Sequence, residues 1–378
     1  MCKNFSAKNY NFVSVNRKGV VKMSYCKKKC ISLFLTEDCN LDCKYCYCKS
    51  DRKKSKPMDM EFIKCAIDDF YKQYGTIYLR FFADGEPTLE LDVIKKSIEY
   101  AREKDENSIF ELQTNGFFNE QVCKWLGENI DIIWISFDGT SDIQDYYRPA
   151  LNGKKSSPVV ERNIRYLTGI EGIKVGVRIT IGNKNMFRQK EIVDYLDDMG
   201  VKYVYTCVLF ADTSNTYYEG DISRMDYAKE TAKAVKYAES KGIFLGSTFT
   251  VNFDEPANIS CRACLPAPHL TLDGYISCCD MIYSSRENGE LIYAKYDKEN
   301  NKIIYDEEKM KTIRSRTVEN LPECADCEIK YYCAGGCLGE SLIEKGSIFK
   351  VKTECCDAIK YLAKELGVNR GTYPIFHP

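Results

Sequence analysis

Short apolar segments alternate with amphipathic stretches between residues 30 and 210, and this alternation constrains the fold more than any other feature. The expected strands are Ile31–Thr36, Thr76–Ala83, Ser108–Gln113, Ile132–Phe137, Ile173–Ile181 and Tyr203–Phe210. The expected helices between them are Met60–Tyr71, Leu91–Lys104, Asn119–Glu128, Pro158–Thr168 and Arg188–Met199. Strands that alternate with helices form parallel sheets with right-handed connections. We therefore predict an α/β fold, a partial (β/α)6 TIM-like barrel, with an open doubly wound sheet as the alternative.

The sequence changes character after residue 210. A long helix is expected over Asp221–Lys241, before a turn-rich and cysteine-rich region in which Glu290–Lys295 and Asn301–Asp306 resemble a β-hairpin. Phe12–Val15 and Val20–Met23 resemble another hairpin near the start. The predicted divisions are a basic N-terminal extension (1–29), the barrel (30–215), a bridging helix and linker (216–251) and a cysteine-rich C-terminal domain (252–378).

The chain contains 20 cysteines but only two histidines, His269 and His377. It shows neither a signal peptide nor a run of about 18 apolar residues, so a cytoplasmic protein without a membrane span is expected. Cysteine-rich chains in a reducing compartment more often bind metal than form disulfides, and thiolates without imidazole favour iron–sulfur clusters or zinc. The net charge of −1 argues against nucleic-acid binding.

The first 30 residues carry eight cations and no acidic residue. These cations are Lys3, Lys8, Arg17, Lys18, Lys22, Lys27, Lys28 and Lys29. Such a run is either a solvated start to the chain or a docking patch for an acidic partner.

The motif Cys39-x3-Cys43-x2-Cys46 directly follows the first expected strand. Three thiolates in a short loop can hold a four-iron cluster and leave one iron open to another molecule. A structural zinc site would instead need a fourth ligand, for which Cys48 is a candidate.

Further motifs end the next three strands: residues 83–87 (ADGEP), 113–116 (QTNG) and 135–139 (ISFDG). The carboxyl ends of parallel strands meet at one end of the fold, where such proteins build their sites. Together with the cysteine motif, this series resembles the radical S-adenosylmethionine superfamily, although Asp84 replaces the first glycine of the family's GGEP motif.

The resemblance implies a [4Fe–4S] cluster, bound to S-adenosylmethionine, that generates a 5′-deoxyadenosyl radical. Tyr45 would pack near the adenine, and Ser136 with Asp138 would help to hold the carboxylate or ribose. Arg148 or Arg178 would pair with the carboxylate. The other expected cofactor-binding residues are Gly85, Glu86 and Pro87, which would meet the methionine amino group, together with Thr114 and Asn115.

The cysteines after residue 260 resemble the SPASM extension of this superfamily, which implies two auxiliary [4Fe–4S] clusters. One would use Cys261, Cys264, Cys279 and Cys337, and the other Cys324, Cys327, Cys333 and Cys355. Cys278 and Cys356 are near-equivalent alternatives to their neighbours. A zinc ribbon would use only two Cys-x2-Cys pairs and leaves Cys333 and Cys337 unexplained. The pair Cys26 and Cys30 is either a redox pair or without a function.

Relatives with this extension mostly oxidise peptide or protein side chains, so the resemblance implies a maturase of a ribosomally made precursor peptide. It would install a thioether or carbon–carbon cross-link and receive electrons from a flavodoxin or ferredoxin. Anaerobic sulfatase maturation, which forms formylglycine, and small-molecule oxidation are the alternatives. Asp280 is the candidate base, or else a turn-capping carboxylate. The basic N-terminal segment and the Tyr293–Tyr305 hairpin are candidates for gripping an acidic leader peptide.

Overall fold

The computed structural model describes residues 29–46, 56–209, 222–282, 284 and 289–368. Its sheet follows the order β11-β10-β9-β8-β1-β2-β3-β4-β5-β6-β7. The neighbours from β1 to β7 are all parallel, which confirms the predicted α/β class. The strands that were expected are β1 (Ile31–Phe34), β2 (Tyr78–Phe82), β3 (Ile109–Thr114), β4 (Ile132–Ser136), β5 (Lys174–Ile181) and β6 (Tyr203–Val208).

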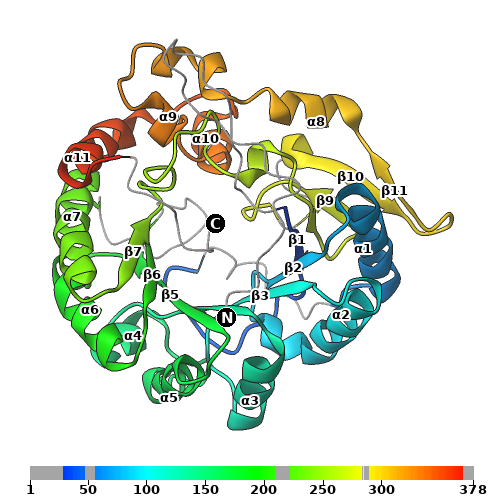
Figure 1. Cartoon of the computed structure of the whole chain (residues 1–378), viewed down its shortest axis with the longest axis horizontal. Coiled ribbons are helices and arrows are strands. Elements are labelled where there is room, and N and C mark those ends of the chain that lie inside the picture. Colours follow the sequence, from blue (N-terminus) through cyan, green and yellow to red (C-terminus); the bar gives the residue numbers. More distant parts are fainter. Residues whose placement is uncertain (1–28, 47–55, 210–221, 283, 285–288, 369–378) are drawn as a thin grey trace.

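Helices surround the parallel strands (Figure 1). They are α1 (Met60–Tyr74), α2 (Leu91–Lys104), α3 (Glu120–Asn129), α5 (Ser157–Thr168), α6 (Gln189–Asp198) and α7 (Arg224–Ser240). Local sequence sets their ends. The side chain of Asp59 caps α1 by accepting from the Glu61 amide, and Gly75 ends it in the left-handed conformation. The side chain of Ser223 caps the start of α7 by accepting from the Asp226 amide.

Two elements of this half were not predicted. The short helix α4 (Ser141–Tyr147) follows β4, and β7 (Phe244–Ser247) pairs with β6 as a further parallel strand. Because the parallel strands lie in chain order, the sheet lacks the reversal that defines a doubly wound fold. The doubly wound alternative is therefore wrong.

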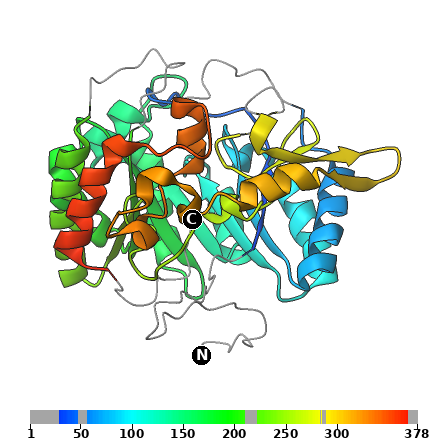
Figure 2. The ribbon, with the colours of Figure 1, turned by 90° about the horizontal axis from the view of Figure 1, so that it is seen from above.

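The cysteine-rich region continues the same sheet. Strand β8 (His269–Leu270) runs parallel to β1, and β9 (Tyr275–Ser277) and β10 (Ile292–Asp297) extend it. The expected hairpin is confirmed as β10 paired with β11 (Lys302–Tyr305), and it projects from one side of the molecule (Figure 2). The hairpin expected between residues 12 and 23 lies outside the described residues. The remaining helices are α8 (Glu307–Arg314), α9 (Lys330–Cys333), α10 (Leu338–Lys345) and α11 (Cys356–Leu366).

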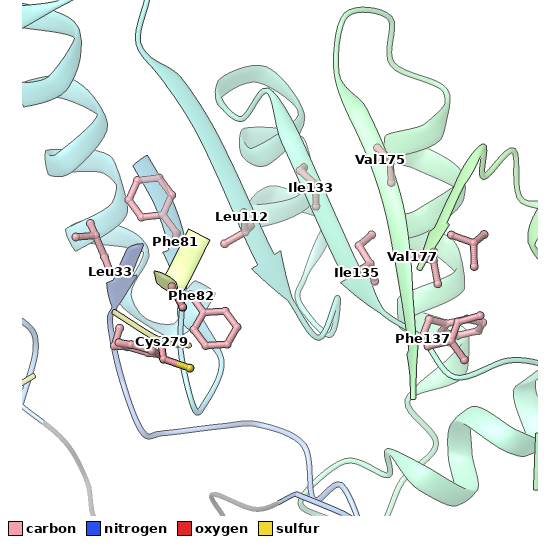
Figure 3. Packing of buried hydrophobic residues seen from close by; sticks show 14 of the residues in the cluster. Leu33, Phe81, Phe82, Leu112, Ile133, Ile135, Phe137, Val175, Val177 and Cys279 are labelled. Atoms are coloured by element: carbon pink, nitrogen blue, oxygen red, sulfur yellow. The ribbon is translucent and has the colours of Figure 1, made fainter. Parts of the chain in front are cut away.

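The two faces of the parallel strands differ in chemistry. Alternate residues such as Leu33, Phe81, Leu112 and Ile133 are buried in one apolar cluster that includes helix residues (Figure 3). Their neighbours in sequence include Ser32, Arg80 and Glu111, which are buried and polar. Because side chains alternate across a strand, these polar residues occupy the opposite face. Within the ranges described, no helix is long and apolar enough to cross a membrane.

Candidate active site

The loop after β1 brings Cys39, Cys43 and Cys46 together around Leu41. Burial raises the pKa of Cys43 to about 12; Arg148 opposes this shift, and the Cys46 and Cys39 thiols add to it. The three cysteines predicted to hold the first cluster therefore lie close to one another.

Backbone hydrogen bonds tie this loop to the segment that follows α4. The Asp42 amide donates to the Pro149 carbonyl at 2.7 Å, and the Lys44 amide donates to the Tyr147 carbonyl at 2.9 Å. The end of helix α4 and the residues after it thus support the cysteine loop, and seven residues are too few to show a clear helical period in the sequence.

Asp138 joins the loop to the ends of β4 and β5. Its carboxylate accepts from the Tyr45 hydroxyl, from Arg148 Nε at 2.9 Å and from the Thr180 amide at 3.0 Å. The Asp138 side chain is completely buried. Asp138, Arg148 and Tyr45 were all expected to lie near S-adenosylmethionine. In the structure their polar atoms form hydrogen bonds within the protein.

Glu86 plays a similar part between β2 and β3. Its carboxylate accepts from the hydroxyls of Thr88 and Thr114, each at 2.6 Å, and from the Asn115 amide at 2.7 Å. Pro87, the next residue, is buried at the start of a 3-10 turn. Asn115 also approaches Cys39, with Nδ2 3.7 Å from Sγ. Three of the motifs therefore meet at the cysteine loop.

Gly85 allows the β2 end to touch this loop. A Cβ atom on Gly85 would lie 1.9 Å from the carbonyl oxygen of Asp38, which is a clash with backbone. The neighbouring Glu86 amide donates to the same carbonyl at 2.7 Å. Glycine is required here by close approach of two backbone segments.

Ser136 and Arg178 are register partners at the end of β4 and on β5. Arg178 Nη1 donates to Gln113 Oε1 at 2.8 Å, and its guanidinium lies 5.5 Å from the centre of the Tyr205 ring. Within the described part of the chain, no carboxylate forms an ion pair with Arg178. Of the two arginines expected to bind a carboxylate, Arg178 is thus the one without an acidic partner there.

Asp280 lies in a charged cluster inside the sheet. Both of its oxygens accept from Arg80 Nη1, at 2.8 and 2.7 Å, and His269 Nδ1 lies 2.7 Å from Oδ1. Burial alone would raise the pKa of Asp280, but Arg80 and His269 outweigh it and hold that pKa well below its usual range. The carboxylate is ionised at neutral pH, and 36% of its side chain remains exposed.

Sequence reasoning missed Arg80 and His269. Arg80 is 2% exposed and also approaches Glu111, with Nε 3.3 Å from Oε1. A cation in the middle of an apolar strand was the available signal, because charged residues are rarely buried unless they are paired. His269 stands in a two-residue strand, which is too short to show a pattern.

Cys261, Cys279 and Cys337 form a second group of thiols. Burial raises the pKa of Cys279 well above its ordinary value, and Cys337, Cys278 and Cys261 raise it further. Cys264 lies at the end of a 3-10 turn, where its amide donates to the Cys261 carbonyl at 3.2 Å. Cys337 raises the pKa of Cys279 but is not among the causes of the raised pKa of Cys278, which favours Cys279 as the member of the group.

Cys324, Cys327 and Cys333 form a third group of thiols, and Cys356 lies closer to it than Cys355 does. Burial raises the pKa of Cys333 to about 12, and Cys324, Cys356 and Cys327 raise it further. Cys356 packs against the apolar cluster that holds Cys324, whereas Cys355 belongs to the main core. The pKa of Cys355 responds, after burial, to Lys352 and Glu340 and to no other thiol. These contacts favour Cys356 over Cys355, its alternative from the sequence, as the fourth member of the group.

A tight turn separates Cys333 from Cys337. Ala334, Gly335 and Gly336 all have positive φ, at 50°, 75° and 70°. The fully buried Arg316, which sequence reasoning missed, holds this turn by donating to the Ala334 carbonyl at 3.3 Å and to the Gly335 carbonyl at 3.0 Å.

The three groups consist of thiols alone, which suits iron–sulfur clusters. Thiols become thiolates when a metal supplies positive charge, so the residues fit the implied clusters. Across the described ranges, no three His, Cys, Asp or Glu side chains lie close enough to hold a single metal ion. Cys30 is completely buried, and Cys26 and Cys48 lie outside the described residues.

Comparisons with curated proteins give relatives of several activities. The chain is 34% identical over 180 residues to an uncharacterised protein of Methanocaldococcus jannaschii, covering 47% of this chain and 61% of that one. It is 30% identical to the Fe-coproporphyrin III synthase of Methanosarcina barkeri, covering 47% of this chain and 43% of that one. It is 29% identical to a cysteine-type anaerobic sulfatase-maturating enzyme of Clostridium novyi, covering 40% of this chain and 43% of that one. The chain thus spans about half the length of these relatives.

Solved structures share the fold over most of the chain. The structure of anSMEcpe with bound AdoMet and the Cp18Cys peptide matches with a TM-score of 0.72 and 17% identity, covering 89% of this chain and 96% of that one. Streptococcus suis SuiB bound to the precursor peptide SuiA matches with a TM-score of 0.62 and 16% identity (86% and 75%).

A family model described as the radical SAM superfamily matches residues 33–196, which include the cysteine loop and all the strand-end motifs. The match agrees with the parallel sheet and with the three thiols that converge after its first strand. The chain therefore carries a radical SAM enzyme domain over residues 33–196.

Proposed function

We propose that this enzyme is a peptide maturase that oxidises side chains of a ribosomally made precursor peptide. Cys39, Cys43 and Cys46 would hold a [4Fe–4S] cluster that, with S-adenosylmethionine bound, supplies a 5′-deoxyadenosyl radical for hydrogen abstraction. The chain's own residues bind and orient the reactants around that chemistry.

One observation carries the proposal. The Arg80–Asp280 ion pair, at 2.7 Å, joins the middle of β2 to the residue that follows Cys279. An auxiliary-cysteine segment therefore reaches the interior of the sheet that also positions the radical-generating loop. Such an arrangement suits an oxidation in which a second electron leaves the substrate after the hydrogen atom.

The auxiliary clusters are assigned from the thiol groups. One would be held by Cys261, Cys264, Cys279 and Cys337. The other would be held by Cys324, Cys327, Cys333 and Cys356. A flavodoxin or ferredoxin is the expected external electron donor.

S-adenosylmethionine would lie over the carboxyl ends of β2 to β5. Arg178 and Ser136 are proposed to bind its carboxylate, because Arg178 offers a guanidinium without an acidic partner among the described residues. The backbone of residues 85–87 and 114–115 and the ring of Tyr45 would line the rest of the site. Asp138 and Arg148 act as positioning residues through Tyr45.

Asp280 is proposed as the acceptor of the proton that leaves the oxidised group. Arg80 and His269 fix its orientation and keep it ionised. Its low pKa makes it a weak base, but a positioned carboxylate still serves when the departing proton belongs to a strongly acidic radical intermediate.

The substrate class rests on two comparisons: the anSMEcpe and SuiB structures were both solved with peptides. Sulfatase maturation and small-molecule oxidation remain the alternatives, because the curated relatives include an anaerobic sulfatase-maturating enzyme and an Fe-coproporphyrin III synthase.

The decisive experiment is S-adenosylmethionine cleavage by the reconstituted, dithionite-reduced enzyme. Cys39→Ala is expected to abolish 5′-deoxyadenosine formation. Cys123→Ala, a buried cysteine of α3 outside the three thiol groups, is the matched control and should retain cleavage. Continued cleavage by Cys39→Ala would refute the radical mechanism.

The substrate is tested by incubation with small peptides encoded beside the gene. A cross-link removes two hydrogen atoms from the peptide mass, whereas a formylglycine reacts with a hydrazide probe. The first result supports the proposal, and the second would replace it with sulfatase maturation.

A further inference from the structure

Two arginines on the polar face of the parallel strands donate hydrogen bonds to the same side-chain oxygen. Arg80 Nη2 lies 3.0 Å from Gln113 Oε1, and Arg178 Nη1 lies 2.8 Å from it. The three residues belong to β2, β3 and β5, which follow one another in the sheet with only β4 between the last two (Figure 1). Guanidinium groups only donate, so the oxygen of the Gln113 amide, not its nitrogen, faces them. The orientation of this amide is thus set by two cations.

Arg80 is held firmly from its other side. Its Nη1 donates to both oxygens of Asp280, and its Nε lies 3.3 Å from Glu111 Oε1. The Arg80 side chain is almost completely buried. A buried cation that pairs with two carboxylates can move only by leaving charges unpaired, which is costly. Gln113 therefore has a fixed hydrogen-bond donor on this side.

Arg178 lacks such support. In the described part of the chain, Gln113 Oε1 is the one hydrogen-bond acceptor of its guanidinium, which also lies 5.5 Å from the centre of the Tyr205 ring. A guanidinium carries five N–H donors, so most of them are left for a ligand. A contact with an aromatic ring attracts the cation but does not fix the direction of its N–H groups. The aim of the Arg178 guanidinium therefore depends on Gln113.

We infer that Gln113 is a positioning residue, which aims Arg178 at the carboxylate of S-adenosylmethionine and ties it through Arg80 to Asp280. The inference rests on the proposed function, because there Arg178 is the ligand of that carboxylate. Asp280 directly follows Cys279, so one series of hydrogen-bonded side chains joins the S-adenosylmethionine site to an auxiliary-cysteine segment. A guanidinium binds a carboxylate through paired N–H groups, and this geometry is lost when the guanidinium can rotate.

The test measures equilibrium binding of two probes to the reconstituted enzyme without a reductant, so that no turnover occurs. The probes are S-adenosylmethionine and its decarboxylated form, which keeps the amino group and the sulfonium but lacks the carboxylate. Gln113→Leu removes the shared oxygen and is expected to weaken S-adenosylmethionine binding by about tenfold. Binding of the decarboxylated probe should change by less than about twofold, because that probe makes no use of the Arg178 guanidinium.

Two comparisons separate positioning from a general loss of structure. In an Arg178→Met background, Gln113→Leu should weaken S-adenosylmethionine binding by less than about twofold, because its effect passes through Arg178. Gln189→Leu removes a buried glutamine of α6 that contacts Thr231 of α7, and it should leave the binding of both probes within about twofold of wild type. Unchanged binding in Gln113→Leu, equal losses for the two probes, or a similar loss in the Arg178→Met background would overturn the inference.

Arg80→Lys tests the tie to Asp280. It keeps the charge but loses the fork that reaches Asp280 and Gln113 together, and we expect S-adenosylmethionine binding to weaken by about threefold. In the Gln113→Leu background the same change should add less than about twofold. An equal effect in both backgrounds, or none in either, would overturn the tie. Failure of the proposed function is seen separately, as absent 5′-deoxyadenosine formation by the dithionite-reduced wild-type enzyme.

Discussion

The buried carboxylate of Asp138 offers a sharp test of how the cysteine loop is held. Asp138→Asn keeps the side-chain shape but removes the charge that faces Arg148, whose side chain is 11% exposed. Breaking one partner of a buried ion pair costs about 3–5 kcal/mol. The Thr180 amide and the Tyr45 hydroxyl would each lose a charged acceptor as well. We therefore expect Asp138→Asn to destabilise the fold by about 3–5 kcal/mol.

A matched substitution lies four residues away. Asp142 pairs with Arg188 at 2.7 Å, but the Asp142 side chain is 66% exposed. Exposed ion pairs contribute about 0–1 kcal/mol, so Asp142→Asn should change stability little. The two variants make the same chemical change and differ in burial, which isolates the factor that decides the cost.

Guanidinium denaturation of the reconstituted enzyme under anaerobic conditions gives the free energy of unfolding of each variant. These free energies can be compared when the variants have the same m-value. Hydrogen exchange of peptides covering residues 39–46 and 178–181 reports whether the loop itself opens. Arg148→Met added to Asp138→Asn removes the stranded cation, and this double variant should be at least about 1 kcal/mol more stable than Asp138→Asn alone. Losses of similar size in Asp138→Asn and Asp142→Asn would refute the reasoning.

Two further substitutions test the site. Cys356→Ala should lower the iron content by roughly four of about twelve irons per chain. Cys355→Ala should leave the iron content unchanged. The reverse result would identify Cys355 as the ligand. Gly85→Ala should displace the Asp38 backbone and weaken S-adenosylmethionine binding, measured calorimetrically, because its Cβ has no space. Unaltered affinity in Gly85→Ala would show that the contact is not needed.

The regular part of the fold was predictable because buried parallel strands produce continuous apolar runs. The structure has α2 over Leu91–Lys104, the bounds that the sequence predicts. Strand β7 was missed because four residues, Phe-Leu-Gly-Ser, give no pattern to distinguish a strand from a turn. Strand β8, with two residues, is formed by its pairing with β1 rather than by any local preference.

The site was predictable as a set of residues but not as a set of contacts. Ser136 and Asp138 stand two apart, as if on one face of a strand, but β4 ends at Ser136 and Asp138 turns to meet Arg148. Cys355 and Cys356 are indistinguishable by spacing. Cys356 begins α11, where successive side chains rotate by about 100°, so the two thiols point in different directions and Cys356 is the one near Cys324 and Cys333.

The polar contacts around Asp280 explain how so short a strand joins the two halves of the enzyme. Strand β8 forms only two register pairs with β1, whereas β1 and β2 form four. Arg80, on β2, crosses this junction to Asp280, which follows β9, and His269, on β8, contacts the same carboxylate. A buried ion pair specifies geometry more than it adds stability. Its effect here is to fix the register in which the auxiliary cysteines approach the interior of the barrel.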